Sequence, residues 1–195
     1  NIGILVFFKY SNFLIENVNR ISNLLGQNGQ LKPFDILLPV GISFYIFQAL
    51  SYTMDVYRGK IKATKNLFRY ALFVSFFPQL VAGPIERSSN LLKQFDEKHD
   101  FDVDRVRAGL LIMLWGLFMK MVIADNIAPS VNMIYEYYPQ YTGIEIIVAT
   151  VLFAFQIYCD FAGYSLLAIG SAKVMGFTLM ENFRSPYLAT SVSDF

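Results

Sequence analysis

The chain has 195 residues, of which 55% are hydrophobic and 16% aromatic, and its formal net charge is only +1. This composition favours a membrane protein over a soluble domain, and so small a net charge excludes a basic nucleic-acid-binding face. The single cysteine, Cys159, excludes an internal disulfide and a cysteine-rich metal site.

Apolar stretches near the start of the chain predict the first membrane segments. The stretch before Lys9 is interpreted as the end of a spanning helix, and residues 16–33 as a polar, exposed connection. From Ile36 to Met54 there are 19 uncharged residues. As a helix they would reach roughly 28 Å, close to the roughly 30 Å of a hydrocarbon core.

The segment from Tyr70 to Ile85 is short for a crossing and is interrupted twice. Pro78 lies inside the apolar run, and Gly83-Pro84 ends it just before two charged residues. Proline removes a backbone donor and clashes with the preceding turn, so an uninterrupted spanning helix is disfavoured. We therefore expect a re-entrant or interfacial element here.

Two more spans are predicted downstream. Residues 108–124 contain one charged residue, Lys120. It lies near one end of the stretch, from which its amine can reach the membrane interface. Residues 146–172 are interrupted only by Asp160. Between these spans, residues 126–143 are predicted to form an external loop rich in tyrosine.

The distribution of positive charge predicts the orientation. Ten of the 16 Lys and Arg residues lie between Arg58 and Arg107, and none lies between Lys120 and Lys173. Cytoplasmic loops carry an excess of Lys and Arg, so the 58–107 region is predicted to be cytoplasmic. If residues 70–85 crossed the bilayer, one basic flank would violate this tendency, which favours the re-entrant interpretation.

These observations predict an all-α fold: a polytopic membrane protein with three to four spanning helices and one short, broken re-entrant or interfacial segment. Residues 1–195 are interpreted as a single membrane domain and as a piece of a longer protein, because the chain begins inside an apolar stretch and stops abruptly.

Asp160 is the first candidate functional residue. A carboxylate at mid-span costs on the order of 3 kcal/mol, so it needs a partner or a wet cavity. Gln156, Asp160 and Tyr164 recur every four residues and form one polar stripe on a helix. No cation is expected at the same depth, so we predict a hydrogen-bond network along this wall, either lining a channel or fixing helix packing. Tyr158, Gly163 and Ser165 add polar or small neighbours.

His99, the only histidine, lies in the charged run 96–107, which is predicted to be solvated, and no catalytic role is assigned to it. Asp102 or Asp104 is expected to cap the helix that follows. Cys159 is interpreted as a small apolar residue. No Ser-His-Asp set, metal-spaced cluster or glycine-rich phosphate loop can be assembled.

Several sequence blocks resemble the membrane-bound O-acyltransferase family, and within it the bacterial alginate O-acetyltransferases and the D-alanyl transfer protein of teichoic acid synthesis. In chain order the blocks are "FFKYSNFLIENVN" (7–19), "LPVGISFYIFQALSYTMDVYRGKI" (38–61), "FVSFFPQLVAGPIER" (73–87), "QIYCDFAGYSLLAIGSAKVMGF" (156–177) and "ENFRSPYLATSVSDF" (181–195).

The resemblance implies transfer of an acyl group, by expectation acetyl, from a cytoplasmic thioester donor to a hydroxyl of an exported polysaccharide or partner protein. The donor is expected to be acetyl-CoA or a carrier-protein thioester, with no bound cofactor and no metal. Expected partners are the lipid bilayer, the acceptor and an acyl carrier protein, with the bacterial inner membrane as the location. The family's base is a membrane-embedded histidine that this stretch does not contain, so no catalytic residue is assigned here.

Substrate-channel positions are implied where this chain matches the family's motifs. They are Gln79, Gly83 and Pro84 in the first motif, Asp160, Gly163, Tyr164 and Ser165 in the second, and Asn182, Pro186 and Tyr187 in the third. Gln156 and Tyr158 join this set from the polar stripe and its neighbours. Leu166 departs from the family, which usually has Asp or Asn there.

A second class of protein also fits the residues. Broken helices and a buried carboxylate are typical of transporters, so a transporter or flippase for an envelope glycan or lipid carrier is the alternative.

Overall fold

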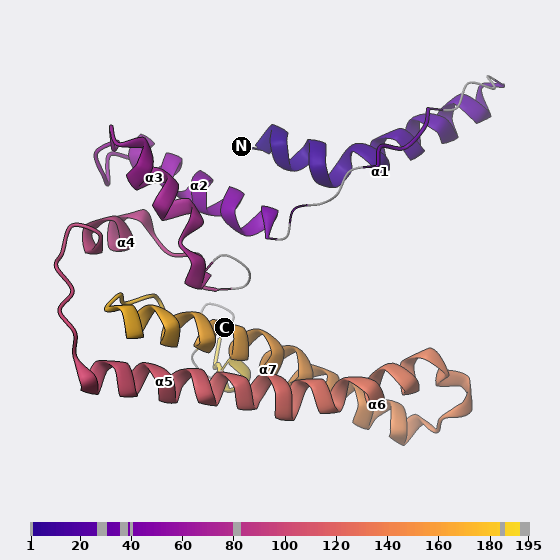
Figure 1. Cartoon of the computed structure of the whole chain (residues 1–195). Coiled ribbons are helices and arrows are strands. Elements are labelled where there is room, and N and C mark those ends of the chain that lie inside the picture. Colours follow the sequence, from indigo (N-terminus) through magenta and orange to yellow (C-terminus); the bar gives the residue numbers. More distant parts are fainter. Residues whose placement is uncertain are drawn as a thin grey trace.

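The computed structural model describes residues 2–26, 31–35, 39, 41–79, 83–183 and 186–191 (Figure 1). Every regular element in these ranges is helical, and the described residues contain no strand. The predicted all-α class is therefore confirmed for the described part of the chain.

Two long antiparallel helices dominate the structure (Figure 1). The first runs unbroken from Val103 to Glu136 through α5 (Val103–Leu117), the π-helical η2 (Phe118–Ala124) and α6 (Asp125–Glu136). The second is α7 (Gly143–Met175). Among the described helices, these two are long and apolar enough to cross a membrane. Further spans and the re-entrant placement stay predictions.

The loop predicted over residues 126–143 is helical for most of its length, so that part of the prediction is wrong, whereas its external location stays a prediction. Helix α6 continues to Glu136 despite Pro129, and a short 3-10 turn, η3 (Tyr138–Gln140), leads to Thr142. Proline is tolerated near the start of a helical segment or where the local backbone is already irregular, and Pro129 follows the π-helical turn by five residues. The first long helix is 34 residues, about 51 Å.

The ends of these helices follow from local side-chain chemistry. Asp102 caps α5 by accepting from the amides of Asp104 and Arg105 at 2.9 and 3.1 Å, which confirms one of the two predicted caps. Thr142 and Glu145 form a capping box at the start of α7. At the other end, Gly176 adopts a left-handed φ of 96° and ends α7.

Glycines bring α5 and α7 into close contact. A Cβ on Gly109 would lie 2.8 Å from the carbonyl oxygen of Gly170, and one on Gly116 would lie 2.7 Å from that of Gly163. The two pairs are seven residues apart on each helix, so they recur along one seam. Small residues at a seam let the backbones of two membrane helices pack closely. Close packing matters there because the hydrophobic effect contributes little to helix association within a membrane.

The N-terminal part is built differently. Helix α1 (Ile2–Leu24) includes Lys9 and the first half of the predicted 16–33 connection, so that connection is shorter than predicted. Two asparagines of α1, Asn12 and Asn19, each exchange a pair of hydrogen bonds with the backbone of residues 31–35. Helix α2 covers Ile42–Tyr57; residues 36–38 and 40 of the predicted span lie outside the described residues.

The interrupted apolar segment is broken where proline predicts a break. Helix α3 (Leu67–Ser75) stops after nine residues, and the 3-10 turn η1 (Phe77–Gln79) carries Pro78. After the undescribed residues 80–82, the chain continues into α4 (Ser88–Gln94). These elements pack against the C-terminal half of α7 through a buried core of Phe73, Phe76, Leu91, Leu92, Ala168, Ala172 and Leu179.

Candidate functional site

Asp160 forms an ion pair with Lys120 in the seam between the two long helices. The Lys120 amine lies 2.7 Å from a carboxylate oxygen of Asp160 and 2.8 Å from one of Asp125. It also sits 5.5 Å from the centre of the Tyr164 ring, within reach of a cation–π interaction. The Lys120 amine therefore contacts two carboxylates and one aromatic ring.

The π-helical turn explains how Lys120 reaches Asp125 on its own helix. In an α-helix, residues four apart share a face, whereas a π-helix pairs residue i with residue i+5. Lys120 lies within the π-helical segment Phe118–Ala124, and Asp125 follows it by five residues. The π-helical turn therefore places Lys120 where its amine reaches a carboxylate on its own helix as well as one on α7.

The structure corrects two predictions about this charge. Lys120 is not near the end of a span, because its helix continues to Glu136 and places it at the midpoint. Asp160 lies at the midpoint of α7, and the antiparallel arrangement brings the two midpoints together. The expected absence of a cation at that depth, and the hydrogen-bond network proposed in its place, are therefore wrong.

The predicted site residues of α7 divide between opposite sides of the helix. Asp160 is two positions from both Tyr158 and Ala162, which is about 200° around an α-helix. Tyr158 and Ala162 line a cavity, whereas Asp160 faces Lys120. The structure thus places the charged pair and the cavity on different faces of α7.

The cavity has a volume of about 380 Å³ and mixes apolar walls with a few polar groups. Ser165, which is almost fully buried, accepts a hydrogen bond from the Asn182 amide at 2.9 Å. Leu166, the departure from the family pattern, also lines this cavity. A volume of this size with few convergent polar groups is typical of small-molecule sites.

The segment after α7 closes one side of the cavity through aromatic contacts. The ring of Phe183 meets those of Tyr158 and Phe161, with centroids 6.0 and 5.1 Å apart. Tyr187, in the 3-10 turn η4 (Pro186–Leu188), donates its hydroxyl to the carbonyl of Ala154 at 2.6 Å. Two predicted positions, Asn182 and Tyr187, are therefore held against α7, and Pro186 begins the turn that carries Tyr187.

The first motif occupies a separate position beside α7. Gln79 is buried and donates to the carbonyl of Phe73 at 3.0 Å. A Cβ on Gly83 would lie 2.4 Å from Cα of Gln79 and 3.0 Å from Cβ of Ala168. A side chain here would collide with the backbone of Gln79, so only glycine permits this approach, and it also lies close to α7. Pro84 is fully buried next to it, and none of these three residues lines the 380 Å³ cavity.

The remaining predicted positions have packing contacts. Gly163 is the glycine that meets Gly116, so its missing side chain serves the helix seam. The Gln156 side-chain oxygen is buried and lacks a hydrogen-bond partner among the described residues. Cys159 packs with Met119, Ala124 and Ala162, among others, as a small apolar residue.

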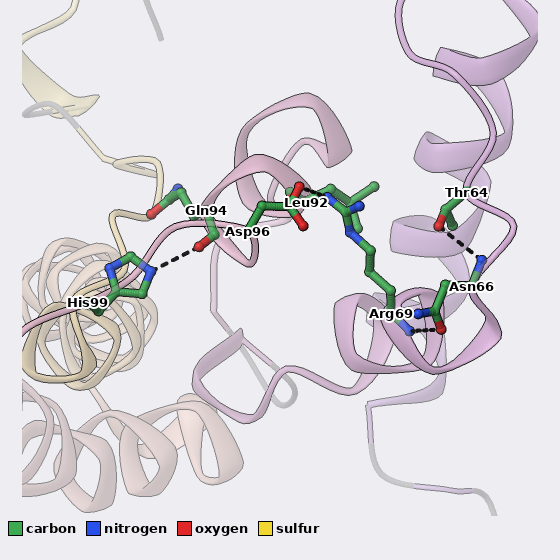
Figure 2. Close-up of polar contacts among 7 residues, drawn as sticks. All are labelled: Thr64, Asn66, Arg69, Leu92, Gln94, Asp96 and His99. Carbon is green, nitrogen blue, oxygen red and sulfur yellow. Dashed lines mark hydrogen bonds and ion pairs between the residues drawn. The ribbon is translucent and has the colours of Figure 1, made fainter.

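His99 is not fully solvated as predicted. Its Nε2 lies 2.9 Å from the carbonyl oxygen of Gln94, as Figure 2 shows. Its ring stacks at a tilt on Phe177, 4.5 Å between centroids, and fills the space beside Gly176. The charged run therefore contributes one side chain that fastens the end of α7.

Sequence reasoning missed Glu86 as a fastening residue. Its carboxylate is fully buried and accepts from the Asn90 amide and the Met180 backbone, both at 2.7 Å. Gln94 adds two bonds to the backbone of Thr178, so α4 is tied to the segment after α7. The signal in the sequence is an acidic residue two positions after the Gly-Pro break.

Comparison with known proteins places these observations in a family. Residues 61–195 match MBOAT, the membrane-bound O-acyltransferase family. The chain is 39% identical to the probable alginate O-acetylase AlgI of Pseudomonas putida, covering 100% of this chain and 40% of that protein. It is 34% identical to the peptidoglycan O-acetyltransferase of Helicobacter pylori, over 100% of this chain and 41% of that protein.

A more distant relative is the teichoic acid D-alanyltransferase of Bacillus subtilis, 27% identical over 84% of this chain and 42% of that protein. The chain thus spans about 40% of the length of the curated relatives it matches. The ordered motifs, the two apolar helices and the family match agree, and this chain belongs to the membrane-bound O-acyltransferase family.

Proposed function

We propose that the protein to which this chain belongs is a membrane O-acyltransferase that moves an acetyl group from a thioester donor to a hydroxyl acceptor. The observation that carries this proposal is the family match over residues 61–195, together with relatives named as O-acetyl-transferring enzymes. It favours an acyltransferase over the transporter that the mid-helix carboxylate also fits. The acceptor is proposed to be an exported polysaccharide or a partner protein.

In this reaction the acceptor oxygen attacks the thioester carbonyl, loses its proton to a base, and expels the donor sulfur as a thiol or thiolate. We assign no base to the described residues, because His99 is occupied by structural contacts. The proposed role of this chain is to shape and position the reaction space. The cavity beside Ser165 and Asn182 is the candidate for that space.

The test is an assay of the purified full-length protein in liposomes. Radiolabelled acetyl-CoA or an acetylated carrier protein would be supplied with a polysaccharide acceptor, and free thiol and labelled acceptor would both be measured. We expect thiol release that matches label transfer one to one. Transport of a lipid-linked glycan without either product would support the transporter instead.

We further propose that the 58–107 region is cytoplasmic and that the turn between α6 and α7 lies outside, in a multi-pass inner-membrane protein. Cysteine labelling of intact cells tests this in a background with Cys159 replaced. Tyr138→Cys is suitable because Tyr138 is exposed, whereas Thr142 caps α7. A membrane-impermeant reagent should label Tyr138→Cys and leave Lys62→Cys unlabelled; labelling of Lys62→Cys would overturn the orientation.

A further inference from the structure

A second cavity, of about 500 Å³, lies between the 60–65 segment, α3 and α4, away from the acyl-transfer candidate. Five of its lining residues carry positive charge: Lys60, Lys62, Lys65, Arg69 and Lys93. Among the residues that the structure describes, no Asp or Glu lines it. A concave surface lined by one sign of charge concentrates counter-ions, so this cavity selects anions.

Most of this charge is unneutralised. Arg69 is the exception: it forms an ion pair with Asp96 and donates to the Leu92 carbonyl at 2.6 Å (Figure 2). The side-chain amines of the cavity's lysines have no ion pair or hydrogen bond with any part of the chain that the structure describes. Four amines thus remain available to an external anion.

The backbone that carries the lysines is held in place. The amide of Thr64 donates to the Tyr52 hydroxyl at 2.9 Å, which ties the segment to α2. Asn66 caps α3 by accepting from the Arg69 amide at 3.2 Å, as Figure 2 shows. Arg69 then joins α3 to α4. The cationic cavity is therefore a fixed feature of the fold, not a flexible tail of lysines.

Apolar side chains stand directly beside the charge. Leu67 and Phe68, in the first turn of α3, are 75% and 87% exposed. An anion that fits both features has a charged phosphate and an apolar body. Basic clusters and basic pockets of membrane proteins bind anionic lipid headgroups.

We propose that this cavity is a binding site for the phosphate of an anionic phospholipid, with the acyl chains against Leu67 and Phe68. The site is distinct from the acyl-transfer cavity and does not depend on the proposed activity. The phosphates of coenzyme A share the same chemistry, so the experiment must separate the two sources.

The experiment uses the purified full-length protein in a neutral detergent. The probes are short-chain phosphatidylglycerol and phosphatidylcholine of the same chain length, with binding followed at low and high salt. We expect the anionic lipid to bind more tightly than the neutral one, and the difference to shrink as salt screens the charges.

The variant Lys60→Gln/Lys62→Gln/Lys65→Gln removes three charges from one wall and should weaken phosphatidylglycerol binding about tenfold or more. The matched control Lys9→Gln/Arg20→Gln/Lys32→Gln removes three exposed charges elsewhere and should change binding less than twofold. Lys93→Gln tests the opposite wall with a single substitution and should weaken binding up to about fivefold.

Unchanged phosphatidylglycerol binding in both cavity variants would overturn the site. Displacement of the lipid by equimolar coenzyme A would overturn the lipid assignment and give the site to a phosphate-bearing donor. Inorganic phosphate should displace the lipid only at far higher concentration, because it lacks the apolar body; displacement by it at equimolar concentration would also overturn the proposal.

Discussion

The two faces of α7 use polar groups in opposite ways. On one face, the carboxylate of Asp160 forms an ion pair with the Lys120 amine at the two-helix seam. On the other, Ser165 and Asn182 bond to each other at the wall of a cavity large enough for a small molecule. A charge at the midpoint of a long apolar helix is therefore not by itself evidence of a substrate contact, and Ser165 and Asn182, at the wall of the cavity, are the better candidates.

The largest expected effect comes from destroying the seam that holds both faces. Gly163→Leu would place a side chain where even a Cβ lies 2.8 Å from the Gly116 carbonyl. Because backbone cannot yield as a side chain can, we expect loss of folded protein, measured as monodisperse yield in detergent. Gly143→Leu is the control, since nothing lies within 4 Å of its Cβ position. Normal yield of Gly163→Leu would show that the seam is not required.

The next largest effect is expected from a substitution that removes only the ion pairs of Lys120. Lys120→Met leaves two carboxylates without their cation and should destabilise the protein by about 1–2 kcal/mol, as for interhelical polar contacts in membranes. The double variant Lys120→Met/Asp160→Asn should recover part of that loss, because the charge is removed with its partner. Thermal unfolding of the four proteins of this cycle measures the coupling. Additive losses would mean that the two residues act independently.

A smaller stability effect, with a larger functional one, is expected on the cavity face. Ser165→Ala and Asn182→Ala each remove one hydrogen bond, worth about 1 kcal/mol. Acetyl transfer by the full-length protein should fall more steeply than the melting temperature. Asp160→Asn is the comparison: if the charged face serves packing and electrostatics, its activity should follow its stability. If Asp160→Asn instead loses activity more steeply than stability, and the Ser165 and Asn182 variants do not, the charged face would be the one that contributes to acetyl transfer.

The smallest effect is expected from His99→Ala, which touches neither face. It loses the contacts with Phe177 and the Gln94 carbonyl, so we expect a loss of roughly 1 kcal/mol or less and normal acetyl transfer. His99→Gln keeps a hydrogen-bond donor, so its stability should lie between those of the wild type and His99→Ala. If a stable His99→Ala protein had lost acetyl transfer, His99 would have to take part in the reaction.

Sequence reasoning predicted the elements whose cause is local. The apolar runs around Lys120 and Asp160 indicated the two long helices, Pro78 indicated the break in the short segment, and Asp102 indicated a cap. Each of these elements depends on residues a few positions away. The helices follow from their hydrophobic content, the break from the amide hydrogen that proline lacks, and the cap from a carboxylate at the right position. The helix ends were less predictable, because α6 continues through polar residues and Pro129 in a stretch that was predicted to be a loop.

The pairing of residues across the fold required the tertiary structure. Lys120 and Asp160 are 40 positions apart, and only the antiparallel seam, set by the glycine pairs, brings their midpoints together. The same holds for Glu86 with Met180 and for Ser165 with Asn182. The sequence by itself determined the class, the family and the positions of the two long apolar helices, since these depend on composition and local order. Which face of α7 holds charge and which holds a cavity was decided by packing, since a helix presents every side and only its neighbours distinguish them.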